Sequence, residues 1–371
     1  MKKVLIFYIS KHSGHYHAAS AIEKGLCESA DDIKIEKINC LNYTNPILGK
    51  IINRAYMEVI KKKPEIWEHI YDNPNFLKKT KKAREALHKF NMSKIKKLLN
   101  AHSPDIVFCT QAFPCGMVAD YKRTSGKDFP LVGVLTDYAP HSYWLFDEVD
   151  YYIVPARETG SVLEEKGIPR DRIKPLGIPV DPKFREKHVT SKIRRSLGLD
   201  VDASTILIMG GTQGLGAMEE AVKSLLLDKK HKYQILVVAG ANKKLYKRLN
   251  KLNIKTGSEN IRVFSYIDNV DELMDASDVI ISKAGGMTTA ESLAKGLPML
   301  IVDPIPGHER MNTDFLVEKK AAVENKDFSK IHDDINKLFD TEDILSRMRE
   351  NIKFLAKPNS ALDVAKLVLE R

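Results

Sequence analysis

The sequence is poor in cysteine and has no long apolar run. Its four cysteines among 371 residues show neither the spacing of a metal site nor a disulfide framework. This pattern predicts that the protein is located in the reducing cytoplasm. No stretch approaches the roughly 20 apolar residues needed to span a bilayer. The apolar start Val4–Ile9 is short and Lys11 follows closely, so it predicts a β-strand and not a signal peptide. Any membrane contact is therefore expected to be peripheral, at the inner face of the cell membrane.

Two common nucleotide-binding motifs are missing as well. The turn after the first predicted strand does not contain the GxGxxG motif, which argues against the binding of a dinucleotide cofactor. The glycine-rich loop 210–216 lacks the Gly-Lys-Ser/Thr of a P-loop, which argues against NTP hydrolysis. Asp200 and Asp202 form a D-x-D by letters, but they precede a predicted strand and are typical of a turn. The sequence therefore predicts no metal and no other cofactor.

The net charge of +10 is concentrated in one segment. Between Lys50 and Lys97 there are fourteen Lys and Arg residues against five Asp and Glu, so the rest of the chain is nearly neutral. This favours an anionic partner surface, and lipid is preferred to nucleic acid because no zinc, helix-turn-helix or RNP pattern accompanies the charge. The alternative is a solvated lysine-rich face on helices that pack against a sheet. The residues predicted to contact a membrane here are Trp67, Lys78, Lys79, Lys81 and Lys82.

The length of the chain is too great for one ordinary core, and two domains of similar size are expected. Short apolar segments alternate with helical patterns through both halves, which predicts two doubly wound α/β domains. The proline-rich piece Gly177–Pro182 is the predicted linker, which gives domains at 1–182 and 183–355, followed by a last helix at 356–371. The predicted strands are Lys2–Ile9, Ile33–Ile38, Asp105–Cys109, Leu131–Leu135, Tyr151–Val154 and Ile173–Leu176 in the first half, and Thr205–Met209, Gln234–Ala239, Arg262–Phe264, Val279–Ser282 and Met299–Val302 in the second.

The second half contains two glycine-rich turns, each between a predicted strand and a predicted helix. Gly210–Gly216 has four glycines in seven residues, and its bare backbone N–H groups can cradle a diphosphate. Lys283–Gly286 precedes a helix in which Glu291 lies one turn in, where a carboxylate can accept from sugar hydroxyls. Because parallel strands end at one edge of a sheet, both turns are expected at a single anion-binding edge.

Polar residues also follow two predicted strands of the first half. His15 comes after the first strand, in a turn before a helix that is expected to open at Ala18. Asp137, His141 and Trp144 stand close together after a later strand. An imidazole has a near-neutral pKa that suits a general base, whereas a lone histidine at such a place is commonly a hydrogen-bonding loop residue. Both interpretations of His15 stay open at this point.

The stretch Val279–Asn312 resembles the monogalactosyldiacylglycerol synthase and diacylglycerol glucosyltransferase family. It contains K-A-G-G-x-T-x-x-E, then a strand, then P-G-H-E-x-x-N. Thr136–Trp144 matches the family's T-D-x-x-x-H-x-x-W, and Ser13–Ala19 matches half of its S-x-G-x-G-H-x-x-A-A, with His12 in place of the first glycine. The resemblance implies the GT-B fold: two Rossmann-like doubly wound domains facing across a cleft, with the last helix crossing back to the first domain.

The resemblance also implies an inverting glycosyltransferase that moves a hexose from a UDP-sugar to diacylglycerol or a related lipid. His15 is then the expected general base, with Asp137 orienting it or replacing it, and His141 and Trp144 are expected at the acceptor. Three alternatives remain: a transferase that uses UDP-GlcNAc, a UDP-sugar 2-epimerase of the same fold, and a non-catalytic nucleotide-sugar or lipid-binding protein.

For the donor, the resemblance implies contacts from both glycine-rich turns and from the stretch that follows the second. Tyr266 lies where the family holds the nucleotide base, and His308, beside Glu309, stands where the family commonly has glutamine at the hexose. The residues expected to bind the donor are Gly14, Gly211, Thr212, Gly214, Gly216, Tyr266, Lys283, Gly285, Gly286, Thr288, Glu291, His308, Glu309 and Asn312.

Overall fold

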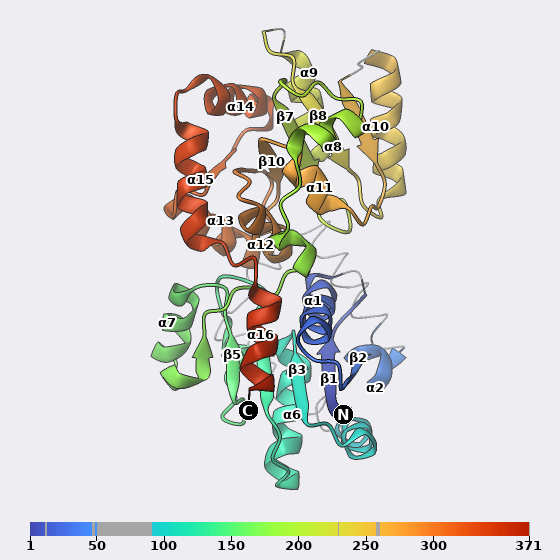
Figure 1. The fold of residues 1–371 in the computed structure, drawn as a ribbon, viewed down its shortest axis with the longest axis vertical. Helices are drawn as coiled ribbons and strands as arrows, with labels where there is room; N and C mark the ends of the chain where they lie inside the picture. Colours follow the sequence, from blue (N-terminus) through green and yellow to red (C-terminus); the bar gives the residue numbers. More distant parts are fainter. Residues whose placement is uncertain (12, 47–48, 50–90, 229, 257–259, 371) are drawn as a thin grey trace. The chain divides into compact units, whose positions relative to one another are not determined.

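The computed structural model divides the chain into two compact units, drawn as a ribbon in Figure 1. The structure describes residues 1–370 except 12, 47–48, 50–90, 229 and 257–259. In this described part, no helix is long and apolar enough to cross a membrane. Unit 1 comprises Met1–Pro182, Pro306–His308 and Asn359–Arg371, and unit 2 comprises Lys183–Ile305 and Glu309–Pro358. The residues predicted to contact a membrane from the basic segment, Trp67, Lys78, Lys79, Lys81 and Lys82, lie outside the described residues.

Unit 1 is built, in its described residues, on a six-stranded parallel sheet with the strand order β2-β1-β3-β4-β5-β6. The strands β3 and β4 are buried along their whole length, as expected of a parallel sheet that is covered on both faces. The order reverses between β1 and β3, and this reversal is the switch point of the sheet. The strands are β1 Lys2–Tyr8, β2 Ile33–Asn39, β3 Ile106–Cys109, β4 Leu131–Val134, β5 Tyr151–Ile153 and β6 Ile173–Lys174.

The two faces of this sheet carry separate apolar cores because successive strand residues point in opposite directions. Leu5 and Phe7 belong to a buried cluster that includes residues of α6, whereas Val4 and Ile6 belong to a cluster with residues of α1 and α16. The helices of this unit include α1 Gly14–Ser29, α2 Cys40–Thr44, α6 Ala112–Ser125, α7 Arg157–Glu165 and α16 Ser360–Leu369, with a further helical stretch at 91–102 and a short 3-10 turn at Ser142–Trp144.

The C-terminal helix α16 packs on α1 within unit 1 (Figure 1). Gly25 of α1 permits this close approach, because a Cβ atom there would lie 2.5 Å from the carbonyl oxygen of Ala361. At the other end of α16, Lys2 donates to the carbonyl oxygen of Leu369 over 3.1 Å. The last helix therefore completes the unit that the first strand begins, which confirms the predicted return of the chain.

Unit 2 has a parallel sheet of the same size in its described residues, with the order β12-β11-β10-β7-β8-β9 and a switch point between β7 and β10. Its last strand, β12, was not among the predicted strands, because its three residues Ala-Val-Glu are only partly buried and form no apolar run. The strands are β7 Thr205–Met209, β8 Gln234–Val238, β9 Ile261–Phe264, β10 Val279–Ser282, β11 Met299–Ile301 and β12 Ala322–Glu324. The helices are α8 Thr190–Ser196, α9 Met218–Leu227, α10 Lys243–Thr256, α11 Val270–Asp275, α12 Gly286–Lys295, α13 His308–Glu318, α14 Ile331–Asp340 and α15 Ile344–Leu355.

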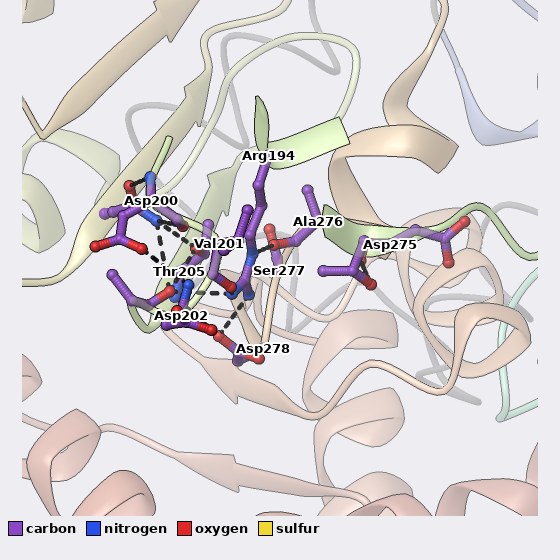
Figure 2. Close-up of polar contacts among 12 residues, drawn as sticks. Arg194, Asp200, Val201, Asp202, Thr205, Asp275, Ala276, Ser277 and Asp278 are labelled. Carbon is purple, nitrogen blue, oxygen red and sulfur yellow. Dashed lines mark hydrogen bonds and ion pairs between the residues drawn. The ribbon is translucent and has the colours of Figure 1, made fainter. Parts of the chain in front are cut away.

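A buried arginine holds the amino ends of β7 and β10 (Figure 2). Arg194 donates to the carbonyl oxygens of Ala276 and Val201, each over 2.9 Å, and to the carboxylate of Asp278 over 2.9 Å. The same carboxylate accepts from the backbone N–H of Thr205. Because its guanidinium is hydrogen-bonded to two carbonyl oxygens and paired with a carboxylate, this buried arginine has a structural role: it clamps the segments before β7 and β10 together.

The D-x-D pair lies beside this clamp and has a structural role (Figure 2). The backbone N–H of Asp202 donates to the Asp200 carboxylate over 2.9 Å, which forms the predicted turn before β7. In the described part of the chain, no group of three or more His, Cys, Asp or Glu side chains is arranged to hold a metal ion.

Candidate functional site

The switch point of unit 1 brings the turn after β1 next to the end of β3. The predicted start of the first helix at Ala18 is wrong by one turn: α1 begins at Gly14, so His15 is a helical residue. Ser13 stands at the N-cap, but its hydroxyl donates back to the carbonyl oxygens of Ile9 and Ser10, at 2.6 and 2.8 Å. It therefore does not cap the helix, and the first N–H groups of α1 have no side-chain cap.

The orientation of the His15 ring is set by Thr110, the residue after β3. The Nδ1 atom of His15 lies 2.7 Å from the carbonyl oxygen of Thr110. A carbonyl oxygen only accepts, so Nδ1 carries the proton and Nε2 keeps its lone pair. The Thr110 hydroxyl in turn donates to the carbonyl oxygen of His15 over 2.9 Å. This reciprocal pair joins the two strand ends and leaves Nε2 as the basic nitrogen.

The pKa of His15 is shifted in opposite directions by burial and by neighbouring groups, among them Asp137 and the Thr110 carbonyl. Burial lowers this pKa below the ordinary histidine value, because the imidazolium loses solvation, and this influence is the larger. The charge of the Asp137 carboxylate raises the pKa and partly opposes the effect of burial. The net shift is downward, so the ring is neutral and able to accept a proton at pH 7.

The segment after β4 holds the other predicted residues of unit 1. Asp137 is half-buried and acts on His15 through its charge. The Nδ1 atom of His141 accepts from the backbone N–H of Tyr143, and its ring stacks on Trp144 with 6.5 Å between centroids. Trp144 is only 5% exposed and belongs to the apolar core. Its burial favours a structural role under the loop, and its contact with an acceptor or membrane stays a prediction.

In unit 2, the glycine-rich loop after β7 packs against the turn after β8. The backbone N–H of Ala241 donates to the carbonyl oxygen of Thr212 over 2.8 Å, and the Asn242 amide donates to that of Gly214 over 3.1 Å. The Cβ of an alanine at Gly214 would come nearer than 3.0 Å to the carbonyl oxygen of Ala239. Gly214 is therefore required for packing.

The other side of this loop is open. Gly211 and Gly216 both have positive φ, 64° and 93°. A Cβ atom at Gly211 would meet nothing within 4 Å, and one at Gly216 would approach only the Lys283 side chain, at 4.0 Å. The open side of the loop thus adjoins the second glycine-rich turn, as expected of two turns at the switch point.

That second turn, after β10, leads directly into α12. Gly285 occupies the N-cap, so no side chain caps the first N–H groups of the helix by a hydrogen bond, although the Lys283 and Glu309 side chains lie beside this residue. Lys283 forms an ion pair with Glu309, and both side chains are largely buried, at 13% and 2% exposed. The Asn312 amide donates to the carbonyl oxygen of Ala284 over 2.9 Å and is fully buried.

The remaining predicted donor residues lie along the same edge of unit 2, apart from two that belong to unit 1. Tyr266, after β9, is 51% exposed, Glu291 is half-buried on α12, and Thr288 is buried in its first turn. Gly14 and His308 are the first residues of α1 and α13, and both are half-buried. Gly286 begins α12. The contacts of these residues with a donor stay predictions.

Each half of the chain matches the profile of a known family. Residues 15–180 match monogalactosyldiacylglycerol (MGDG) synthase, and residues 205–367 match the glycosyltransferase family 28 C-terminal domain. The chain belongs to the MGDG synthase and glycosyltransferase 28 family. The first match begins at His15, and the second contains both glycine-rich turns of unit 2.

Members of this family resemble the chain over nearly its whole length. The processive diacylglycerol beta-glucosyltransferase of Bacillus pumilus is 29% identical over 371 residues, which cover 100% of this chain and 95% of the relative. The protein of the same name from Bacillus subtilis is 29% identical over 361 residues, 97% of this chain and 93% of the relative.

Solved structures show the same fold. The crystal structures of Acinetobacter baumannii MurG and of the UDP-GlcNAc 2-epimerase from Neisseria meningitidis match with TM-scores of 0.66 and 0.63. Both comparisons cover 100% of the two chains, at 15% and 13% identity. The MurG likeness, together with the two doubly wound sheets, confirms the GT-B fold predicted for this glycosyltransferase family.

Three residues at these edges were missed by the sequence patterns. Thr110 orients His15, Asn242 holds the glycine-rich loop, and Asp303, just beyond β11, has a positive φ of 49°. Thr110 and Asn242 act through contacts with distant segments, which no local pattern records. Asp303 could have been noticed in the sequence, because it is an acidic residue that follows a buried strand and directly precedes a proline, which restricts its backbone.

Proposed function

We propose that this glycosyltransferase moves a hexose from a UDP-sugar to diacylglycerol, with inversion at the anomeric carbon, at a membrane surface. The observation on which the proposal rests is the pair of family matches, one to each half, together with full-length similarity to diacylglycerol beta-glucosyltransferases. The chemistry of the two strand edges supports it, because unit 2 offers uncapped helix N–H groups and unit 1 offers a neutral imidazole.

In this proposal unit 2 holds the donor. The open side of the loop at Gly211 and Gly216 and the N-terminus of α12 at Gly285 offer backbone N–H groups to the diphosphate. The Lys283 side chain, which comes from the second turn and lies next to Gly216 of the first, supplies positive charge while paired with Glu309. As the bond between the anomeric carbon and the phosphate oxygen breaks, these groups stabilise the charge that develops on the leaving UDP. Glu291 is assigned to the ribose hydroxyls.

The acceptor hydroxyl is activated by His15 in the same proposal. The Nε2 atom takes the hydroxyl proton while the acceptor oxygen attacks the anomeric carbon. The Thr110 carbonyl holds the proton on Nδ1 throughout, so Nε2 is the nitrogen that accepts. Asp137 stabilises the imidazolium that results, since its negative charge favours the protonated ring. A single displacement of this kind inverts an α-linked donor to a β-glycoside.

The pH dependence of transfer distinguishes His15 from Asp137 as the base. Activity requires neutral His15, so kcat/KM is expected to fall on the acidic side, with a midpoint below the ordinary histidine pKa of about 6.5. Asp137→Asn removes the charge that raises the pKa of His15 and is expected to move this midpoint to still lower pH. If Asp137 is the base, the variant loses nearly all activity at every pH, and the assignment to His15 is wrong.

The identity of the sugar and of the acceptor is tested by one transfer assay. The chain is incubated with UDP-glucose, UDP-galactose or UDP-GlcNAc and diacylglycerol vesicles, and the lipid products are separated. Glucosyl-diacylglycerol is the expected product, as the names of the relatives suggest. Conversion of UDP-GlcNAc to its 2-epimer without a lipid product, or binding of UDP without turnover, would replace the proposal by one of the alternatives.

Docking to an anionic membrane is part of the proposal, because diacylglycerol stays in the bilayer. Each Lys or Arg near an anionic surface contributes about 1 kcal/mol, over a Debye length of about 8 Å at physiological salt. Changing Lys78, Lys79, Lys81 and Lys82 together to Glu is therefore expected to reduce sedimentation with anionic vesicles strongly. Binding by the unchanged chain should rise with the anionic lipid fraction and fall with added salt.

A charge-matched control makes this vesicle experiment specific. The exposed helix α10 carries Lys243, Lys244, Lys247 and Lys251, and their joint change to Glu alters the net charge by the same amount. This control is expected to bind vesicles nearly as well as the unchanged chain. Equal sedimentation of all three proteins, or equal binding to neutral vesicles, would leave the basic segment as an ordinary solvated surface.

A further inference from the structure

Asp303 adopts a backbone conformation that its sequence context disfavours. It follows the last buried residue after β11, Val302, and precedes Pro304. Its φ of 49° lies in the left-handed region, which few residues other than glycine adopt. A following proline drives the preceding residue toward extended conformations instead. Strain of this kind persists where the surrounding structure enforces it, and it clusters at functional sites.

The carboxylate of Asp303 is exposed and without a bonding partner. Among the residues that the structure describes, none donates a hydrogen bond to it or forms an ion pair with it. Partial desolvation raises the pKa of Asp303, and the charges of Glu309 and Glu220 raise it further, while Lys283 acts in the opposite direction. The charged groups that act on Asp303 are thus residues around the two glycine-rich turns.

Glu309, the carboxylate that the family resemblance assigns to the hexose, is in the opposite situation. One of its oxygens is paired with Lys283 and the other accepts from the backbone N–H of Ile305 over 2.9 Å. The side chain is only 2% exposed. These contacts fix the loop from 303 to 309 against the turn after β10 and leave little of the carboxylate for a ligand.

We propose that Asp303 is the carboxylate that accepts hydrogen bonds from the hexose hydroxyls of the donor, and that Glu309 is a positioning residue that holds Lys283 and the loop. This inference rests on the proposed function, since it assumes a UDP-hexose at the edge of unit 2. A carboxylate repels a diphosphate and accepts from neutral hydroxyls. Asp303 is therefore suited to the sugar end of the donor and Lys283 to its diphosphate.

Calorimetry with UDP and with UDP-glucose or UDP-galactose tests the assignment, with Asp303→Asn as the main variant. Asparagine tolerates positive φ and keeps the shape while removing the charge. Loss of a charged acceptor is expected to weaken binding of the UDP-hexose about tenfold or more. Affinity for UDP alone should stay the same or increase, because a negative charge near the diphosphate is removed. Opposite effects on the two ligands are not expected of a purely structural residue.

A second pair of variants separates strain from recognition. Asp303→Gly relieves the positive φ and is expected to raise the melting temperature while losing the same hexose affinity. Asp343, also in unit 2, has a φ of 65° before α15, so Asp343→Gly is the matched control. It should raise the melting temperature without changing either affinity.

Four outcomes decide the matter. A lower ratio of UDP-hexose to UDP affinity in both Asp303 variants supports the inference. An unchanged ratio, in a chain whose wild type binds the UDP-hexose, overturns it and leaves the proposed function standing. Equal weakening of both ligands makes Asp303 a support of the loop and also overturns it. A wild type that binds neither UDP nor a UDP-hexose overturns the proposed function itself.

Discussion

Replacement of His15 by alanine is expected to lower turnover by about 10²–10⁴-fold, the range of a lost general base. The affinity for UDP should stay nearly intact, because the proposed donor contacts come mainly from unit 2. Turnover is expected to fall because the Thr110 carbonyl keeps the proton of His15 on Nδ1 and leaves Nε2 able to accept the proton of the acceptor hydroxyl. Steady-state kinetics with the preferred UDP-hexose, and calorimetry with UDP, provide the two measurements.

A neighbouring histidine supplies the control for this experiment. His17 lies in the same turn of α1 and contacts the edge of the Tyr16 ring, with 5.9 Å between centroids. His17→Ala removes the same side chain without touching Thr110 and is expected to keep most of the activity. Turnover of His15→Ala within a few-fold of wild type would move the role of base to Asp137. A parallel loss in His17→Ala would indicate damage to α1 and not loss of a base.

The second large effect is expected from Gly214→Ala. The new methyl group would come nearer than 3.0 Å to the carbonyl oxygen of Ala239, a backbone atom that cannot swing aside. Overpacking of this kind destabilises by about 1–3 kcal/mol, and the φ of 55° adds about 1–2 kcal/mol for a residue with a Cβ atom. The loop is expected to shift, so UDP affinity should fall along with the free energy of unfolding.

Gly198→Ala separates the clash from the conformational effect. Gly198 follows the C-cap residue of α8 in the same unit with a φ of 65°, but a Cβ atom there has only an ordinary contact, 3.7 Å from the Arg262 side chain. This variant should show the smaller, conformational loss of stability and an unchanged affinity for UDP. Denaturant unfolding and UDP calorimetry on both variants give the comparison. Equal stability losses would mean that the turn after β8 yields to the methyl group.

The parts of the structure that the sequence predicted well are those set by local pattern. The apolar run at Val279–Ser282 and the glycines of 210–216 specify a strand and a turn by their own chemistry, whatever the distant chain does. The parallel order then places both turns at one edge. The start of α1 was less predictable, since Gly14 and His15 are weak helix formers that join the helix because tertiary contacts hold them there.

The parts that were not predicted depend on contacts across long separations. The bond between His15 and Thr110 joins positions 95 residues apart, and the pair of Lys283 with Glu309 spans 26. The sequence motif assigned Glu309 to a ligand, whereas in the structure one carboxylate oxygen pairs with Lys283 and the other accepts from the backbone N–H of Ile305. A motif identifies which residues belong to a site, but the division between binding and support follows from burial and partners.

The return of α16 to unit 1 has a consequence for biosynthesis. The apolar surface that α1 and the sheet present to α16 is covered only when α16 has left the ribosome. This happens long after β6 has been synthesised. At translation rates of about 5–20 residues per second, this interval is roughly 10–40 s. Unit 2 is contiguous apart from three residues and is free to fold earlier. The nascent first half must therefore wait, with an uncovered apolar surface, for a helix that is synthesised only after the whole of unit 2.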